Sequence, residues 1–293
     1  MTKKIVWLIT CVALVAGLWL WKPWQAKSAG VDESLSSSNA ERSEEFEQEV
    51  LSFVIDGRSA NGVNEWHLEG ESAEIVDEII YLNHLKAVVY GEDNSANLFS
   101  DYGVYHKQTG EVELVGNVKV ISKDGAVLLT DKAVWSQITK EVSTDEIVRI
   151  THEKMVAVGR GGMANSEEKK AMLTKDVKVT IEPDTTVTCD GPLAVDYEKS
   201  KAVFYDNVRV EDADGVLFSD KLTVEFDKDA GKVVRVIAEG NVRIKKGKSY
   251  TLSEKAVYTD STKHARLLGN PRVIIDPMEL SKFEDFGAIK GKS

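Results

Sequence analysis

Histidine and cysteine side chains, the common metal ligands and acid–base groups, are too widely spaced in this sequence to form a recognisable site. The histidines include no close-spaced pair, and Cys189 has no second cysteine nearby. A zinc site needs a tighter grouping of ligands, and no G-x-S-x-G or Ser/His/Asp arrangement indicates a nucleophile. We therefore expect no catalytic residue, no metal site, no cofactor and no enzymatic activity. The histidines are His67, His84, His106, His152 and His264.

Three segments rich in glycine or aspartate resemble ligand-binding loops only in composition. Residues 159–162 (GRGG) lack the Lys-Ser/Thr ending and the following helix that give phosphate loops their anion site. Residues 212–215 and 227–231 lack the glutamate that completes an EF-hand calcium loop. We expect a bulge or tight turn in the first segment and hairpin turns in the other two.

The charge of the chain argues against nucleic acid as a partner. Its 48 Asp and Glu residues outnumber its 37 Lys and Arg residues, for a formal net charge of -11, whereas nucleic-acid binding depends on clustered cations. The two cysteines, Cys11 and Cys189, lie in such different surroundings that no disulfide framework is expected.

A different spacing dominates the sequence: a valine, a basic residue and a second valine or isoleucine return about every 30 residues. In the better copies this triplet follows a turn or polar pair, as in GNVKV around Val118 and GNVRI around Val242. Such alternation is typical of a β-strand, and several copies continue through a glycine-containing turn into a second apolar run. The copies are centred on Val118, Val148, Val177, Val208, Val242 and Pro271.

No helical pattern separates these copies, and the apolar runs are rich in Val, Ile, Thr and aromatic residues. We expect each unit to be a meander of two or more antiparallel strands, and the units to stack around one continuous core. The sequence therefore predicts an all-β fold from residue 50 onward.

The N-terminus predicts a membrane anchor. Residues 5–21 are uncharged and mostly apolar, follow Lys3 and Lys4, and end among Trp19 and Trp21. As a helix this segment would be about 26 Å long, near the lower limit for a bilayer, with its tryptophans at the headgroup interface. The alternative is a cleaved signal peptide, which shares the lysines and the apolar run.

Residues 22–49 are expected to form a linker, because residues 31–49 are rich in serine and acidic residues and lack an apolar face. The β portion is expected to divide into residues 50–181 and residues 182–277, and residues 278–293 are a charged tail.

The order of short motifs in the first β region resembles the LptC family, the bitopic periplasmic component of lipopolysaccharide export. After the anchor and the acidic linker come Trp66-His67-Leu68 and then LVGNVKV, LLTDKAVW, VSTDEIVRI, GRGGMA and LTKDVKV. Gly162, followed by Met163, falls where that family carries a functionally important glycine, although Gly161 is an alternative equivalent. The resemblance covers roughly residues 1–181.

The second β region resembles the OstA-like domain of the related periplasmic bridge protein, LptA. The resembling motifs are the GNVRI turn, the following SEKAVY strand and the closing GNPRV. The chain is therefore similar to an LptC protein with an LptA-like module fused behind it, an addition of about 90 residues to the usual LptC pattern.

If each strand alternates, the valines and isoleucines of the repeated triplets lie on one face of successive strands. A packed core between two sheets is one explanation of this apolar stripe. The resemblance implies another, an antiparallel open β-jellyroll, a V-shaped slab of stacked repeats whose groove accepts acyl chains. The groove candidates are Val118, Val120, Trp135, Val148, Ile150, Val177, Val179, Val208, Val210, Val242 and Ile244.

A stack of strands also has an unpaired edge at each end, and such edges suit strand addition to partners. We expect docking at Leu51, Phe53 and Ile55 on one edge and at Val273 and Ile275 on the other. The resemblance implies an inner-membrane protein of a Gram-negative bacterium with its C-terminal region in the periplasm. Its partners would be lipopolysaccharide, the permease and ATPase of an inner-membrane ABC transporter, and an LptA-like bridge protein. The alternative function is a membrane-tethered β-repeat scaffold or adhesion protein without lipid transport.

Overall fold

The computed structural model of the protein describes residues 48–58, 64–90, 95–136, 138–139, 141–165, 168–227, 232–262 and 264–276. The predicted anchor at residues 5–21, nearly all of the linker and the tail at residues 278–293 lie outside these residues. Within the described residues, no helix has the length and apolarity needed to cross a membrane.

The described chain folds into 17 strands of one antiparallel sheet. The all-β antiparallel prediction is confirmed for these residues, which contain no helix, and the architecture is consistent with a β-jellyroll. The strands are β1 (Gln48–Arg58), β2 (Asn64–Val76), β3 (Ile79–Tyr90), β4 (Ser95–His106), β5 (Glu111–Ser122), β6 (Val127–Ser136), β7 (Glu141–His152), β8 (Met155–Asn165), β9 (Lys170–Ile181), β10 (Thr185–Cys189), β11 (Leu193–Asp196), β12 (Lys201–Asp212), β13 (Gly215–Phe226), β14 (Val233–Lys246), β15 (Ser249–Thr259), β16 (His264–Leu268) and β17 (Arg272–Ile274).

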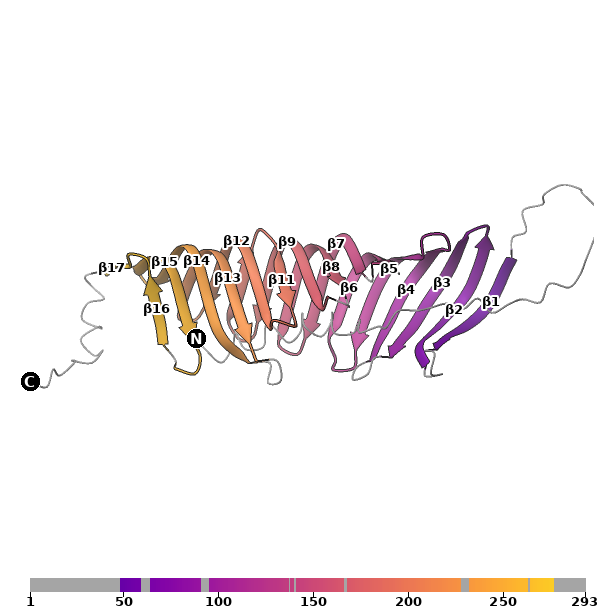
Figure 1. Cartoon of the computed structure of the whole chain (residues 1–293), viewed down its shortest axis with the longest axis horizontal. Coiled ribbons are helices and arrows are strands. Elements are labelled where there is room, and N and C mark those ends of the chain that lie inside the picture. Colours follow the sequence, from indigo (N-terminus) through magenta and orange to yellow (C-terminus); the bar gives the residue numbers. More distant parts are fainter. Residues whose placement is uncertain are drawn as a thin grey trace, which may run out of the picture.

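Apart from β10 with β11 and β16 with β17, each strand pairs with its neighbour in the sequence, so the strands follow one another along the long axis from β1 at one end to β17 at the other (Figure 1). Two strands are interrupted. β10 and β11 lie in succession along β9 and again along β12, and β16 and β17 lie in succession along β15. The pairing of β9 with β10 and β11 joins the two predicted β regions into one sheet.

Most of the long strands bend near the middle, where the pairing register shifts. In β5 the shift lies between Val115 and Val118, and the intervening Gly116 and Asn117 have φ values of 80° and 46°. The same left-handed backbone recurs at Asn241 of β14. Glycine and asparagine adopt this conformation more readily than other residues, so the Gly-Asn pair before the triplet sets the bend in β5 and in β14.

The bend divides each long strand into two arms. In β5 the valine arm is residues 118–122 and the tryptophan arm, which pairs with the arm of β6 that carries Trp135, is residues 111–115. Leu114 and Val118, one from each arm, belong to the same buried cluster, and Phe204 and Val208 of β12 do the same. The core therefore lies between the two arms.

Two clusters make up this core and meet near β6 and β7. One extends from Phe53 to Ala133, and the other from Val148 to Ala256. Between them the β6–β7 pairing lapses from Leu129 to Val134, the longest interruption on β6. The second cluster includes residues that precede β9 and residues that follow β10 in the sequence. The core, like the sheet, therefore continues from the first β region into the second.

Two loop predictions are confirmed and a third lies partly outside the described residues. The register is irregular between Val158 and Arg160, so the GRGG segment contains a bulge within β8. Asp212 accepts hydrogen bonds at Oδ1 from the backbone N–H groups of Asp214 and Gly215, at 2.8 Å and 3.0 Å, in the hairpin turn between β12 and β13. The third turn includes residues 228–231, which the structure does not describe. The first strand begins at Gln48, two residues before the predicted boundary.

Candidate functional site

The pairing register places the second apolar residue of each triplet in one row across the valine arm. Going from strand to strand, Val120 is linked through Leu128 to Ile150, and the row continues through Val179 and Val210 to Ile244. It ends at Ile55 of β1 and at Val273 of β17. One row, which we call the inner row, thus runs the whole length of the sheet, and it is apolar except at Thr251 of β15.

The first valine of each triplet lies beside the bend, two residues from the inner row on the same face. These valines are nearly inaccessible, with exposed fractions of 2% for Val118 and 0% for Val208. Trp135 is different, because it lies on the tryptophan arm between Val112 and Val142. Of the groove candidates, those buried are Val118, Val148, Ile150, Val177, Val179, Val208, Val210 and Val242, and those half-buried are Val120, Trp135 and Ile244.

A small apolar cavity opens between the arms where the two core clusters meet. Its volume is about 80 Å³, and its lining includes Leu128, Val148 and Ile150 from the valine arm and Ala133 and Leu173 from the tryptophan arm. A cavity of about 150 Å³ holds benzene, so this space accommodates only a few carbon atoms. A longer apolar ligand would require the arms to move apart.

Acidic side chains in neighbouring strands hold the bends. The amide Nδ2 of Asn117 donates to Asp101 Oδ2 at 2.7 Å, and Asn241 donates in the same way to Asp220 Oδ2 at 2.8 Å. The equivalent bond at β12 runs from Asn207. Bonding of a polar pair from adjacent strands fixes both the bend and the register, and so it positions the inner row.

Among the described residues, the side chains buried between the two arms are mostly apolar. Among the described residues, no group of histidine, cysteine, aspartate or glutamate side chains is placed to hold a metal ion. Cys189 is buried at 3% exposure, and this burial raises the pKa of its thiol to about 11. A protonated buried thiol is a poor nucleophile, so its role is packing.

Comparison with known families assigns the two halves of this sheet. Residues 9–182 match the family described as lipopolysaccharide-assembly, LptC-related, a match that covers more than half of the chain. The chain belongs to the LptC-related family. Residues 192–290 match a second family, described as LptA/(LptD N-terminal domain) LPS transport protein. No curated protein matches the sequence.

Both matched families are components of lipopolysaccharide transport, and the suspected LptC protein with an LptA-like extension is therefore confirmed. The chain has a role in lipopolysaccharide transport, and its families imply contacts with lipopolysaccharide and with bridge proteins of the export system. Proteins of the LptC family are periplasm-facing, and neither family is known for enzymes.

The LptC-related part carries the glycine singled out by its motif. Gly162 in β8 lines the cavity between the arms, and a Cβ there would lie 3.2 Å from the carbonyl oxygen of Met172 and 3.5 Å from Val148. Its neighbour Gly161 has a φ of 70°, in the left-handed region, and faces Thr174. Both glycines therefore meet a steric demand, one of close packing at the cavity and the other of backbone conformation.

The predicted docking residues lie at the two ends of the sheet. Leu51 and Ile55 of β1 are exposed at 73% and 47%, whereas Phe53 is buried in the first core cluster. Val273 of β17 is exposed at 60%, and Ile275 follows the strand and is half-buried. Within the described residues β1 pairs only with β2, and β17 only with β15.

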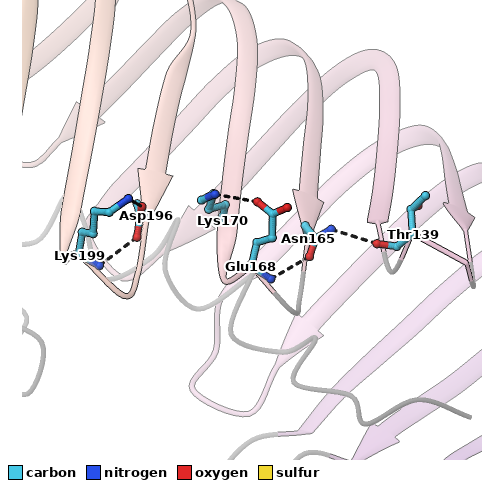
Figure 2. A network of polar contacts seen from close by, with 6 residues as sticks. All are labelled: Thr139, Asn165, Glu168, Lys170, Asp196 and Lys199. Carbon is cyan, nitrogen blue, oxygen red and sulfur yellow. Dashed lines mark hydrogen bonds and ion pairs between the residues drawn. The ribbon is translucent and has the colours of Figure 1, made fainter.

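Polar contacts hold the turns along the free edge of the tryptophan arm, and one of them joins two turns (Figure 2). Asn165 Nδ2 donates to the carbonyl oxygen of Thr139 at 3.0 Å, and Lys170 Nζ donates to Glu168 at 2.7 Å. The bond to Glu168 raises the pKa of Lys170. The bond from Asn165 thus joins two neighbouring hairpins at this edge, whereas the bond from Lys170 stabilises a single turn.

Sequence reasoning missed the half of the core contributed by the tryptophan arm. Leu114, Leu173 and Phe204 each precede a triplet valine by four residues and are buried at 9% or less. The signal was present as an apolar residue four positions before Val118, Val177 and Val208. This signal can be interpreted only when the bend between the apolar residue and the valine is known, because the bend brings the two side chains into one core.

Proposed function

We propose that the protein is a membrane-anchored periplasmic component that receives lipopolysaccharide from an inner-membrane ABC transporter and passes it to the periplasmic bridge. The observation that carries this proposal is the inner row, which runs from Ile55 to Val273 through both family segments and is apolar at every position except Thr251. An apolar path of this kind allows acyl chains to stay out of water over the whole length of the sheet.

The lipid would lie between the arms of a V-shaped jellyroll that opens along its free edges. Opening is required because the cavity of about 80 Å³ is much too small for acyl chains. The bends at Gly116 and Gly240 supply the apex, and the arms separate about them as lipid enters. Side chains of the inner row, now packed on the opposite arm, would then contact acyl chains.

Partners would dock by adding strands to the two ends of the sheet. β1, with Leu51 and Ile55 exposed, would receive a strand of the transporter's periplasmic part, and β17, with Val273 exposed, would receive the next bridge protein. Backbone hydrogen bonds would extend the sheet across both junctions, and the inner row would continue into the partner.

Photocrosslinking tests the groove with a matched control. A photoactivatable residue at Val120 faces the space between the arms, and one at Ile121 faces outward from the adjacent position of the same strand; both side chains are half-buried. In cells that make lipopolysaccharide, we expect lipid adducts at Val120 and at Val210, and few at Ile121.

Equal adduct formation at Val120 and Ile121, or none at any inner position, would contradict the proposal. Absence of adducts together with normal partner capture would instead support a β-repeat scaffold with a closed core. Mass spectrometry of lipids that co-purify with the full chain gives a second, independent readout of the same question.

A further inference from the structure

The basic residues of the repeated triplets form a second row, on the face of the valine arm opposite the inner row. Each follows a buried valine by one position, and successive residues of a strand point to opposite faces. The register links Lys119 through Leu129 to Arg149, and Arg209 through Phe218 to Arg243. The row comprises Lys119, Arg149, Lys178, Arg209, Arg243 and Arg272, and we call it the cationic row.

Its members occupy every second strand and therefore stand roughly 10 Å apart. The intervening strands contribute apolar or uncharged residues, such as Val158, Thr188 and Leu252, and no carboxylate. In a chain with a net charge of -11, six cations aligned without an acidic neighbour in the row call for a physical explanation.

Cations on the tryptophan arm show the ordinary arrangement and provide the comparison. Lys201 and Arg235 flank Glu225 at 3.2 Å and 3.7 Å, and Lys221 and Lys255 flank Glu239 at 3.7 Å and 2.7 Å. These cross-strand pairs are the usual way to stabilise charges on a sheet surface. In the cationic row, by contrast, no carboxylate of the described residues lies within ion-pair distance of Arg243 or Arg272.

At its C-terminal end the cationic row lines a hollow of about 840 Å³. Three guanidinium groups, those of Arg209, Arg243 and Arg272, border it together with the side chains of Phe218 and Leu252. This volume falls in the range of small-molecule sites. The hollow lies on the opposite side of the sheet from the core, so it is separate from the proposed lipid groove.

Phe218 preorganises two of these cations. The Arg243 guanidinium carbon lies 4.5 Å from the centre of the Phe218 ring, and that of Arg209 lies 5.9 Å from the same centre. Cation–π contact holds the guanidinium in place without using its hydrogen-bond donors. The donors of Arg243 thus remain available to an anion.

Acidic groups at the hollow limit what it can bind. Arg209 is already paired with Glu211 at 2.6 Å, and Asp220 and Glu254 lie on the side nearest the bends. Asp220 accepts the amide of Asn241 at 2.8 Å. The anion-accepting part of the hollow is therefore the stretch from Arg243 to Arg272, with Arg209 as a weaker third point.

We propose that this hollow binds a small ligand with two phosphate groups, one at Arg243 and one at Arg272 or Arg209, and with an uncharged body over Phe218 or Leu252. Phosphate matches the planar fork of donors that arginine presents. Two phosphates match the spacing of roughly 10 Å between alternate strands. The phosphate of a membrane lipid shares this chemistry with those of a small soluble ligand, and binding to lipid vesicles is the outcome of the experiment that would favour the lipid instead.

Calorimetric titration of the full chain with a hexose bisphosphate tests the site, with the hexose monophosphate as the single-anion comparison. We expect the bisphosphate to bind more tightly, and Arg243→Gln to weaken it about tenfold or more, the usual effect of losing a charge-assisted hydrogen bond. The matched control is Arg235→Gln. It lies in the same strand, removes the same charge, and affects the ion pair on the other arm.

Loss of bisphosphate binding in Arg243→Gln but not in Arg235→Gln would establish the site. The absence of measurable bisphosphate binding would overturn the proposed site. An equal effect of Arg243→Gln and Arg235→Gln would also overturn it, because it would show only general charge attraction. Binding to phosphatidylglycerol vesicles with none to the bisphosphate would also overturn it and indicate a membrane-facing surface. Circular dichroism of both variants checks that the sheet is intact, and lipid crosslinking at Val120 reports separately on the groove.

Discussion

Replacing Gly116 by alanine should test how the bends are built, with Gly125→Ala as the control. Both glycines have left-handed backbone, with φ values of 80° and 91°. A Cβ at Gly116 would lie 2.6 Å from Asp101 Oδ2 and 3.0 Å from Asp101 Cβ, whereas at Gly125, in the turn before β6, no heavy atom lies within 4 Å. The two substitutions therefore share the backbone cost and differ in the clash.

The left-handed backbone should cost alanine about 1–2 kcal/mol at either position. At Gly116 the side chain of Asp101 must also rotate away, with loss of its 2.7 Å hydrogen bond to Asn117. That loss is worth about 0.5–1.5 kcal/mol, and residual overpacking adds about 1–2 kcal/mol. We expect the free energy of unfolding to fall by about 2.5–5.5 kcal/mol for Gly116→Ala and by about 1–2 kcal/mol for Gly125→Ala.

Urea unfolding of the full chain, followed by circular dichroism and by tryptophan fluorescence, measures both values if the two transitions coincide. The double variant Gly116→Ala/Asp101→Ala removes the carboxylate, the nearer part of the obstacle, while the Cβ of residue 101 stays 3.0 Å away; it should be less destabilised than the sum of its single variants. Equal losses at Gly116 and Gly125, or strict additivity in the double variant, would refute the idea that contact between adjacent strands sets the bend.

Four further predictions concern the core, one edge and one end of the sheet. Phe204 lies in the second core cluster at 0% exposure. Phe204→Ala should lower the free energy of unfolding in urea by about 3–5 kcal/mol, and a loss below about 1 kcal/mol would show that the arms are not packed there. Cys189, whose pKa burial raises to about 11, should resist iodoacetamide at neutral pH in the folded chain and react in urea; rapid labelling of the folded chain would mean that the arms open there. Burial alone would raise the pKa of Asp196, but hydrogen bonds from the side chain and backbone of Lys199 outweigh it and lower the pKa; its stabilising contribution is therefore present above the unfolded pKa and lost as the pH falls through the folded pKa. Asp196→Asn should accordingly lose less stability than the parent on acidification below about pH 4, and identical acid profiles would exclude this contribution. Val273→Pro should reduce capture of a bridge protein at β17, because proline removes a backbone donor, and unchanged capture would rule out docking at this position.

The repeated triplets were sufficient to predict the strands, because alternation between two faces is a local property of an extended chain. Val118 and Val120 lie on the same face as Val208 and Val210 for that reason, and the pairing register bears this out. The glycine–asparagine pairs were also informative, since few other residues accept the backbone they require. The residues alone do not show that these pairs bend the strand into two arms.

By itself, the sequence determined the all-β class, the period of the repeat and the alternation that buries one valine and exposes the basic residue beside it. Only the tertiary structure decided that Leu114 and Val118 belong to one core, that Trp135 lies on the opposite arm, and that Arg209 and Arg243 share one aromatic ring. The physical reason is that alternation acts between adjacent residues. The bends and rows depend instead on contacts such as that of Asp101 with Asn117, between strands whose register is fixed only when the whole sheet forms.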